Sequence, residues 1–182
     1  MNTVIIILLT IIIIASTLTI LYITLYNKIQ FSKIRIDEAE KVIIEELQKR
    51  YEILFKSKKL IEKNTKMDLT IFSDLEALKK SNVSSYDFER KITESIATIY
   101  LIKNDYPKLE EKKEFKEILR SLNESDTKII AAKSFYNKNN SKLNTLLKVF
   151  PSNLIGLIHG IKPQPYYDGK EIFNEIDDGI KI

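Results

Sequence analysis

Apolar and small side chains recur at alternating steps of three and four residues from Glu114 to Phe150. The positions of this seam are Phe115, Ile118, Leu122, Ser125, Ile129, Ala132, Tyr136, Asn139, Leu143, Leu146 and Phe150. Such spacing is typical of a helix that packs lengthwise against other helices, and here it predicts a rod of roughly 55 Å at ~1.5 Å per residue. Pro151 predicts where the rod ends, because proline disfavours helix at the residue before it. The polar seam positions Ser125 and Asn139 are expected to set the packing register.

A second helical stripe precedes this rod. Its positions are Ile36, Ala39, Ile43, Leu47, Tyr51, Leu54 and Ile61. The stripe weakens at Asn64, where Thr65, helped by Asp68, is expected to cap a new helix. Ser84 or Ser85 is expected to cap the helix after that, which the Asn104–Pro107 segment ends.

The predicted fold is therefore all-α, with an antiparallel up-and-down bundle of four helices. The expected helices cover residues 28–63, 66–80, 86–104 and 112–150. The alternative has three long helices, in which the first passes unbroken from Lys63 to Lys80. The chain has no Pro or Gly before Tyr106, so the segment ahead of residue 28 is expected to run straight into the first helix.

That leading segment predicts a membrane helix. The stretch Val4–Leu25 is almost wholly Ile, Leu, Val and Thr, and no charged side chain precedes Lys28. It is long enough to cross a bilayer core of ~30 Å as a helix. A cleavable signal peptide is the rival interpretation, but it usually has a basic leader and a shorter apolar run. We favour an uncleaved single-pass anchor at the cell membrane.

Charge refines the position of the anchor. The formal net charge is +4, and the acidic tail Pro151–Ile182 carries −2, which leaves +6 for residues 28–150. This mild excess fits a surface bearing anionic lipid and is too small to indicate nucleic acid. The positive-inside rule predicts a cytoplasmic helical domain, because basic residues follow the anchor and none precedes it. The interface residues expected at the headgroups are Tyr26, Lys28, Lys33 and Arg35.

Candidate chemistry is sparse. His159 is the single histidine, in an apolar turn without partners at known spacing, and Cys is absent. Nucleotide-binding and nucleophile-elbow patterns are also missing, so we predict no catalytic residue, no metal ligand and no cofactor. Another basic cluster, on the first helix, is interpreted as a solvated face with an acidic partner surface as the alternative. Its members are Lys56, Lys58, Lys59 and Lys63.

The segment after the rod has its own pattern. Ser152 or Asn153 is expected to cap a short helical segment that lies, with Phe150, near Tyr26 and Phe31. Its apolar side chains should either close the end of the bundle or dip into the headgroup layer. They are Leu154, Ile155, Leu157, Ile158 and Ile161. The rest of the tail is expected to be extended and poorly ordered. The predicted divisions are an anchor at 1–27, a bundle at 28–150, and a capping segment with tail at 151–182.

Several of these segments together resemble the LemA family of bacterial membrane proteins. The resemblance spans roughly residues 26–167. Its most specific segments are Asn104-Asp105-Tyr106-Pro107-Lys108-Leu109; Ala131-Ala132-Lys133-Ser134-Phe135-Tyr136-Asn137; Phe150-Pro151-Ser152-Asn153-Leu154-Ile155; and Gly160-Ile161-Lys162-Pro163. The chain departs from the family pattern at Glu40, where Trp is usual, and along Glu52–Ser57, where Pro is usual.

The resemblance implies a single-pass protein with a small helical bundle and supplies no enzyme activity. Some family members are linked to building or shaping membrane compartments, and some carry lipoprotein-type leaders that would place the domain on the external face. We predict a non-enzymatic scaffold or interaction module, with a sensor of anionic lipid and a hydrolase around His159 as alternatives. The candidate partners are the bilayer, another membrane or cytoplasmic protein, and a second copy of the chain.

Overall fold

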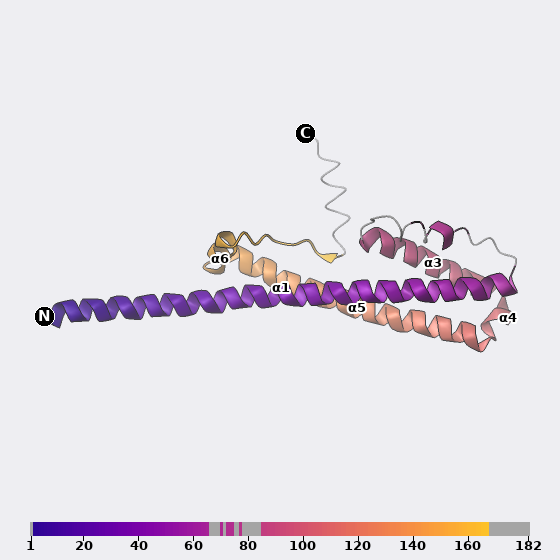
Figure 1. The fold of residues 1–182 in the computed structure, drawn as a ribbon, viewed down its shortest axis with the longest axis horizontal. Coiled ribbons are helices and arrows are strands. Elements are labelled where there is room, and N and C mark those ends of the chain that lie inside the picture. The colour runs from indigo at the N-terminus through magenta and orange to yellow at the C-terminus, as the bar shows by residue number, and fades with distance from the viewer. Residues whose placement is uncertain (1, 66–69, 71, 75–76, 78–84, 168–182) are drawn as a thin grey trace, which may run out of the picture. The chain divides into compact units, whose positions relative to one another are not determined.

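The computed structural model describes residues 2–65, 70, 72–74, 77 and 85–167 (Figure 1). The named helices are α1 (Asn2–Asn64), α3 (Ser85–Asp105), α4 (Pro107–Glu110), α5 (Lys113–Lys148) and α6 (Ser152–Ile158). Regular secondary structure in the described residues is helical throughout, which confirms the all-α prediction. The chain divides into two compact units, each treated by itself below: unit 1 is residues 1–38 with 135–182, and unit 2 is residues 39–134.

Helix α1 is continuous from Asn2 to Asn64, as the lack of Pro and Gly predicts. Thr65 is not helical, which fits the break expected after residue 63. The backbone N–H and the hydroxyl of Thr65 both donate to the Ile61 carbonyl, at 2.8 and 3.0 Å, and the helix that Thr65 is expected to cap begins outside the described residues. Thr65 thus completes the end of α1, where carbonyls lack partners. Its expected helper Asp68, the cap residue Ser84 and most of the 66–80 helix lie outside the described residues.

Unit 2 has a core built from α1, α3 and α5. Its buried apolar residues are Ala39, Ile43, Leu47, Ile53, Leu54, Ile61, Phe72, Ile92, Ile99, Ile102, Leu109, Phe115, Leu122, Ile129 and Ala132. Within this unit α1 and α5 are antiparallel, since Arg50 contacts Ser125 and Lys112 contacts Asn64. Helix α3 ends at Asp105, within the Asn104–Pro107 segment that is expected to end it, and the short helix α4 that begins at Pro107 is not predicted by the sequence.

Unit 1 has a smaller core around the end of α5. Its buried residues are Ile29, Ser32, Ile36, Tyr136, Asn139, Asn140, Leu143, Ser152, Ile155 and Tyr167. They come from α1, α5, α6 and the extended segment after α6, so a single short helix and an extended strap complete the packing of two longer helices.

Burial along α5 confirms the predicted seam, with one correction. Ile118 and Leu146 are half-buried and Phe150 is 74% exposed, while every other seam position is buried. Phe150 is therefore not a seam residue, and α5 ends at Lys148 rather than at the proline. The Ser152 hydroxyl lies 2.6 Å from the Leu146 carbonyl oxygen, in the last turn of α5, and 2.8 Å from the Val149 carbonyl oxygen, which also accepts from the Asn153 N–H at 2.9 Å.

Candidate functional site

The candidate site lies in unit 1, where the apolar run of α1 meets α6. The phenolic oxygen of Tyr22 is 2.7 Å from Nε2 of His159, within hydrogen-bond distance. The ring of Tyr26 lies 4.8 Å from the His159 ring and stacks on Tyr22 at 6.3 Å. The single histidine therefore attaches the end of α6 to the last turns of the apolar stretch. The expectation that this segment lies near Tyr26 is confirmed for His159.

Helix α6 is held closely on α5. A Cβ added at Gly156 would lie only 2.4 Å from Cδ2 of Leu147, so a glycine is needed for the two helices to approach this far. Gly160, at φ +62°, ends α6 with the Ile161 N–H donating to the Gly156 carbonyl and its own N–H donating to that of Leu157. This is the Schellman arrangement, in which a left-handed glycine satisfies the last carbonyls.

The two faces of α6 differ in exposure. Ser152, Ile155 and Gly156 are buried, whereas Leu157 is 79% exposed and Ile158 and Leu154 also point outward. Of the five predicted apolar residues, Ile155 is thus buried in unit 1 and Ile161 is half-buried, while Leu154, Leu157 and Ile158 stay uncovered within the described structure.

The expected side-chain cap of this helix is wrong. The residue before its first turn is Pro151, which makes no side-chain cap hydrogen bond. Ser152 instead turns back to α5, and Asn153 accepts a bond from the adjacent Leu154 N–H at 2.9 Å. The Ser152 hydroxyl therefore serves the Leu146 carbonyl at the end of α5 rather than the first turn of α6.

A groove of about 670 Å³ lies between α1 and α5 within unit 1. Phe31 and Leu146 provide apolar lining, and Lys28 and Lys142 provide ammonium groups. Asn27, Ser32, Ser141 and Thr145 complete it. A groove with apolar walls and two cations suits an amphiphile with an anionic head.

The remaining predicted interface residues do not line this groove. Arg35 donates to Glu38 at 3.0 Å, and its guanidinium carbon lies 4.9 Å from the centre of the Phe31 ring. Lys33 is half-buried, as are Leu25 and Tyr26. Of the predicted basic residues, Lys28 is thus the exposed one, and it lines the groove.

The apolar part of α1 has its side chains uncovered. Val4 is 61% exposed, and the Ile and Leu residues from Ile5 to Ile23 are between 44% and 66% exposed. By length and composition this is one helix able to cross a membrane, with a mean hydropathy of 3.0 in its most apolar window and none of that window buried.

Beyond α6 the chain forms a strap, residues 163–167, held by amide side chains of α5. Asn144 both accepts from the Gln164 N–H at 3.0 Å and donates to the Gln164 carbonyl at 2.9 Å. Asn140 donates to the Pro165 carbonyl at 2.7 Å, and Asn137 accepts from the Tyr167 N–H at 2.8 Å. The prediction of a poorly ordered tail is therefore wrong for the strap, because α5 satisfies its backbone groups. The part after residue 167 lies outside the described residues.

The motif residues that carry the resemblance do not converge on one site. In unit 2, Tyr106 lies between α3 and α4, and Pro107 is the first residue of α4. In unit 1, Tyr136 is buried with its ring centre 5.7 Å from that of Tyr167, while Phe135, the preceding residue, is 40% exposed. These residues make turns, core and strap rather than a reactive cluster.

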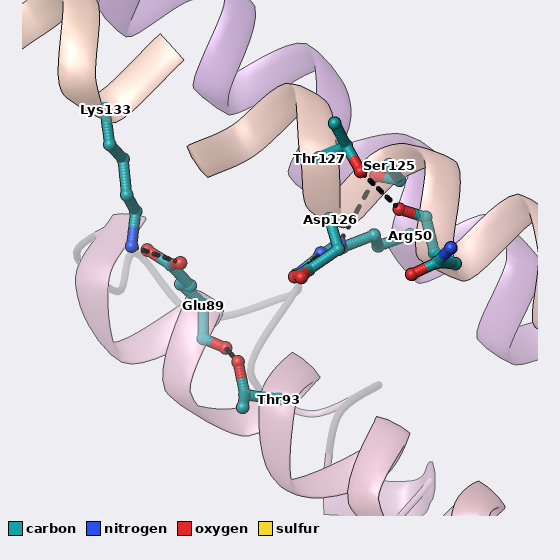
Figure 2. A network of polar contacts seen from close by, with 8 residues as sticks. Arg50, Glu89, Thr93, Ser125, Asp126, Thr127 and Lys133 are labelled. Atoms are coloured by element: carbon teal, nitrogen blue, oxygen red, sulfur yellow. Dashed lines mark hydrogen bonds and ion pairs between the residues drawn. The ribbon is translucent and has the colours of Figure 1, made fainter. Parts of the chain in front are cut away.

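Unit 2 contains a polar network that the sequence pattern does not predict (Figure 2). Arg50 is only 4% exposed and donates from Nε to Oγ of buried Ser125 at 3.2 Å, with an ion pair to Asp126. Lys133 of α5 pairs with Glu89 of α3 at 2.6 Å. These contacts join the helices of the unit across its core. The expected register role of Ser125 thus has a structural counterpart in its bond to Arg50.

Exposed charges elsewhere have local partners. Glu94 accepts a hydrogen bond from Lys91 at 2.8 Å, which lowers the pKa of the Glu94 carboxyl. In the basic cluster of α1, Lys58 pairs with Glu62 at 3.9 Å and lies 5.9 Å from the centre of the Phe55 ring. The described residues contain no group of three or more His, Asp or Glu side chains placed to hold a metal ion.

Comparison with known proteins bears on the chain as a whole. A family model described as the LemA family matches residues 39–176, which is most of the chain. A search of curated proteins finds no match.

Proposed function

We propose, from the premise that this chain belongs to the LemA family, that it is a membrane-anchored scaffold whose helical units bind other proteins. The observation that carries the proposal is the uncovered apolar stretch of α1, which joins a packed helical bundle without a break. In water such a stretch would expose a row of large aliphatic side chains, whereas a bilayer would cover them. The units attached to it would be held at the membrane surface.

The polar contacts also support a binding role, because they join one helix to another. The cross-helix pairs are Arg50–Asp126 and Lys133–Glu89. His159, the residue on which a hydrolase would depend, has its Nε2 beside the Tyr22 hydroxyl and its ring against Tyr26, an attaching contact. We therefore expect His159→Ala to leave any cellular phenotype of the chain close to normal, provided α6 stays docked. A phenotype lost in His159→Ala and kept in Tyr22→Phe would favour a reactive histidine instead.

The orientation follows from charge near the anchor. We place the helical units in the cytoplasm and the N-terminus outside, because Lys28, Lys33 and Arg35 follow the apolar stretch. The chain has no Cys, so single cysteines are clean probes. We expect a membrane-impermeant thiol reagent on intact cells to label Thr3→Cys and to spare Lys113→Cys, both at exposed positions.

The matched pair separates the alternatives. Labelling of Lys113→Cys alone would reverse the orientation and place the units on the external face. Equal labelling of both cysteines on intact cells would mean that the chain does not span the membrane. The same conclusion would follow if neither cysteine is labelled until the cells are opened. Cross-linking in the membrane followed by identification of the attached proteins would name the partner.

The groove of unit 1 favours a second candidate function, recognition of anionic lipid. Lys28 and Lys142 reach it from two helices, beside apolar Phe31 and Leu146. We expect Lys28→Gln with Lys142→Gln to lower the share of anionic lipid that co-purifies with the full chain. Lys116→Gln, an exposed lysine of α5 in unit 2, is the matched control. An unchanged lipid profile in the double variant would remove this candidate.

A further inference from the structure

A second apolar surface lies outside the core of unit 1, on α6 and the turn before it. Its members are Val149, Phe150, Leu154, Leu157 and Ile158. Leu154, Leu157 and Ile158 have the spacing of one helix face, opposite the face that Ile155 and Gly156 bury against the unit, and Val149 and Phe150 precede α6 in the turn. Contiguous exposed side chains of this kind mark an interaction surface in a folded protein.

The chemistry of the surrounding segment is equally one-sided. From Val149 to Ile161 the chain has no Asp, Glu, Lys or Arg, and His159 is its only titratable side chain. Lys148 and Lys162 border this segment, and both are exposed. Lysines with long stems at the edges of an apolar surface can keep their ammonium groups at the headgroups while the surface itself lies deeper.

The position of the surface identifies what covers it. His159 holds α6 at Tyr22. The first charged residue after the apolar run is Lys28, six residues after Tyr22. At ~1.5 Å per residue this is about 9 Å along α1 toward the apolar end. Interfacial helices bury their apolar face about 5–10 Å into the boundary between headgroups and acyl chains. If α1 spans the bilayer, α6 is held at that same depth.

We propose that α6 is a second membrane element, which inserts Phe150, Leu157 and Ile158 into the lipid interface beside the anchor. The inference rests on the proposed membrane anchor and goes beyond it. The occupant is the bilayer rather than a protein partner, because the surface is continuous with the apolar end of α1 through the Tyr22–His159 contact. The two elements together would fix unit 1 against the membrane by two attachments instead of one.

The test uses single tryptophans, because the chain contains none. The full chain is reconstituted in lipid nanodiscs as Leu157→Trp or as Ile158→Trp, and quenching by brominated lipid is compared with quenching by aqueous iodide. Leu21→Trp in the anchor reports the membrane interior. Tyr166→Trp reports the strap, whose neighbour Tyr167 is bonded to Asn137, eleven residues before the end of α5. Circular dichroism of each variant checks that helix content matches the parent chain.

We expect both α6 variants to show blue-shifted emission and strong loss of fluorescence with brominated lipid, near that of Leu21→Trp. Tyr166→Trp should lose fluorescence to iodide instead. Iodide quenching of both α6 variants, while Leu21→Trp responds to brominated lipid, would overturn the inference and leave the anchor standing. Blue-shifted α6 emission that neither agent quenches would mean that protein covers the surface, which also overturns it. A Leu21→Trp that brominated lipid does not quench would refute the anchor itself, and the inference with it.

Discussion

Replacing Arg50 by Met should destabilise unit 2 mainly through Ser125 rather than through the ion pair. The Arg50 side chain is 5% exposed, whereas its carboxylate partner Asp126 is 55% exposed. After the substitution, water can hydrate Asp126, so the loss of the ion pair should cost at most about 1 kcal/mol. Ser125 is fully buried, and its hydroxyl oxygen would lose the guanidinium donor that lies 3.2 Å away.

The magnitude follows from these two contributions. A buried polar group left without its partner costs about 1–3 kcal/mol, and the methionine recovers part of the cost of burying a guanidinium. We therefore expect Arg50→Met to lower the free energy of unfolding by about 2 kcal/mol. For a chain of 150–250 residues this corresponds to a fall of about 4–8 °C in the melting temperature. The assay is thermal unfolding of the full chain in detergent, followed by helical circular dichroism.

Companion variants isolate the cause. Asp126→Asn should cost at most about 1 kcal/mol. Arg120→Met should leave the stability close to that of the parent chain, because the Arg120 side chain is 74% exposed. Adding Ser125→Ala to Arg50→Met should restore about 1 kcal/mol, since no unpaired hydroxyl then remains. A loss in Asp126→Asn equal to that in Arg50→Met, or further destabilisation by Ser125→Ala in the double variant, would refute this reasoning.

Three further outcomes follow from local contacts. Gly156→Val should loosen the packing of α6 on α5, because the valine side chain would collide with Leu147, and the chain should then be cleaved faster by protease after α5. Gly156→Ser should increase the cleavage rate less. Asn144→Leu removes an acceptor and a donor from Gln164, so amide exchange at Gln164 should quicken by about tenfold, the factor for ~1.4 kcal/mol; unchanged exchange would contradict the strap contact. The pKa of Glu94 is held below its usual range by the lysine three residues earlier, so the contribution of Glu94 to α3 is present above the ordinary pKa of a glutamate and is lost as the pH falls through the lowered pKa. Replacing that lysine by Gln should raise the pKa of Glu94 in an NMR titration.

The packing of the long helices was predictable from the sequence because burial in a helix follows a fixed period. Ile43 and Ile129 are buried where the spacing places them, and α3 ends at Asp105, just before the proline that predicts its end. Arg50 shows the limit of this reasoning. It lies three residues after Leu47 on the inner face of α1 and is buried, while Tyr51, which a hydrophobic stripe selects in its place, is only half-buried. Its contact with Ser125 depends on a partner 75 positions away.

The candidate site was harder to predict because its contacts depend on backbone approach. Asn137, Asn140 and Asn144 recur at helical spacing, and in a sequence this pattern also describes a polar face in water. Their partners are backbone groups of the strap, which have no side-chain signature. Gly156 is likewise informative only once Leu147 is seen against it. Sequence patterns report which side chains avoid water, and they do not report which backbone a given amide or glycine will meet.

The contact between Tyr22 and His159 allows a direct test of how α6 is attached to α1. Because the chain has no Cys, the double variant Tyr22→Cys/His159→Cys contains the only two thiols. In the parent chain the two side chains reach each other at 2.7 Å, so a short bifunctional thiol reagent should join the cysteines in the reconstituted protein. Pairing Tyr22→Cys with Lys162→Cys, which is exposed and lies three residues after His159, tests specificity and should react less.

The looser pair Phe31→Cys/Leu154→Cys is expected to react as well, since the groove beside Phe31 is lined by Leu146 near the end of α5. Gly156→Val placed in the Tyr22/His159 pair should reduce cross-linking, because the contact requires α6 to stay on Leu147. Efficient cross-linking that Gly156→Val leaves unchanged would show that the histidine reaches Tyr22 without a docked α6, and cross-linking only between separate chains would replace the internal contact by one between two copies.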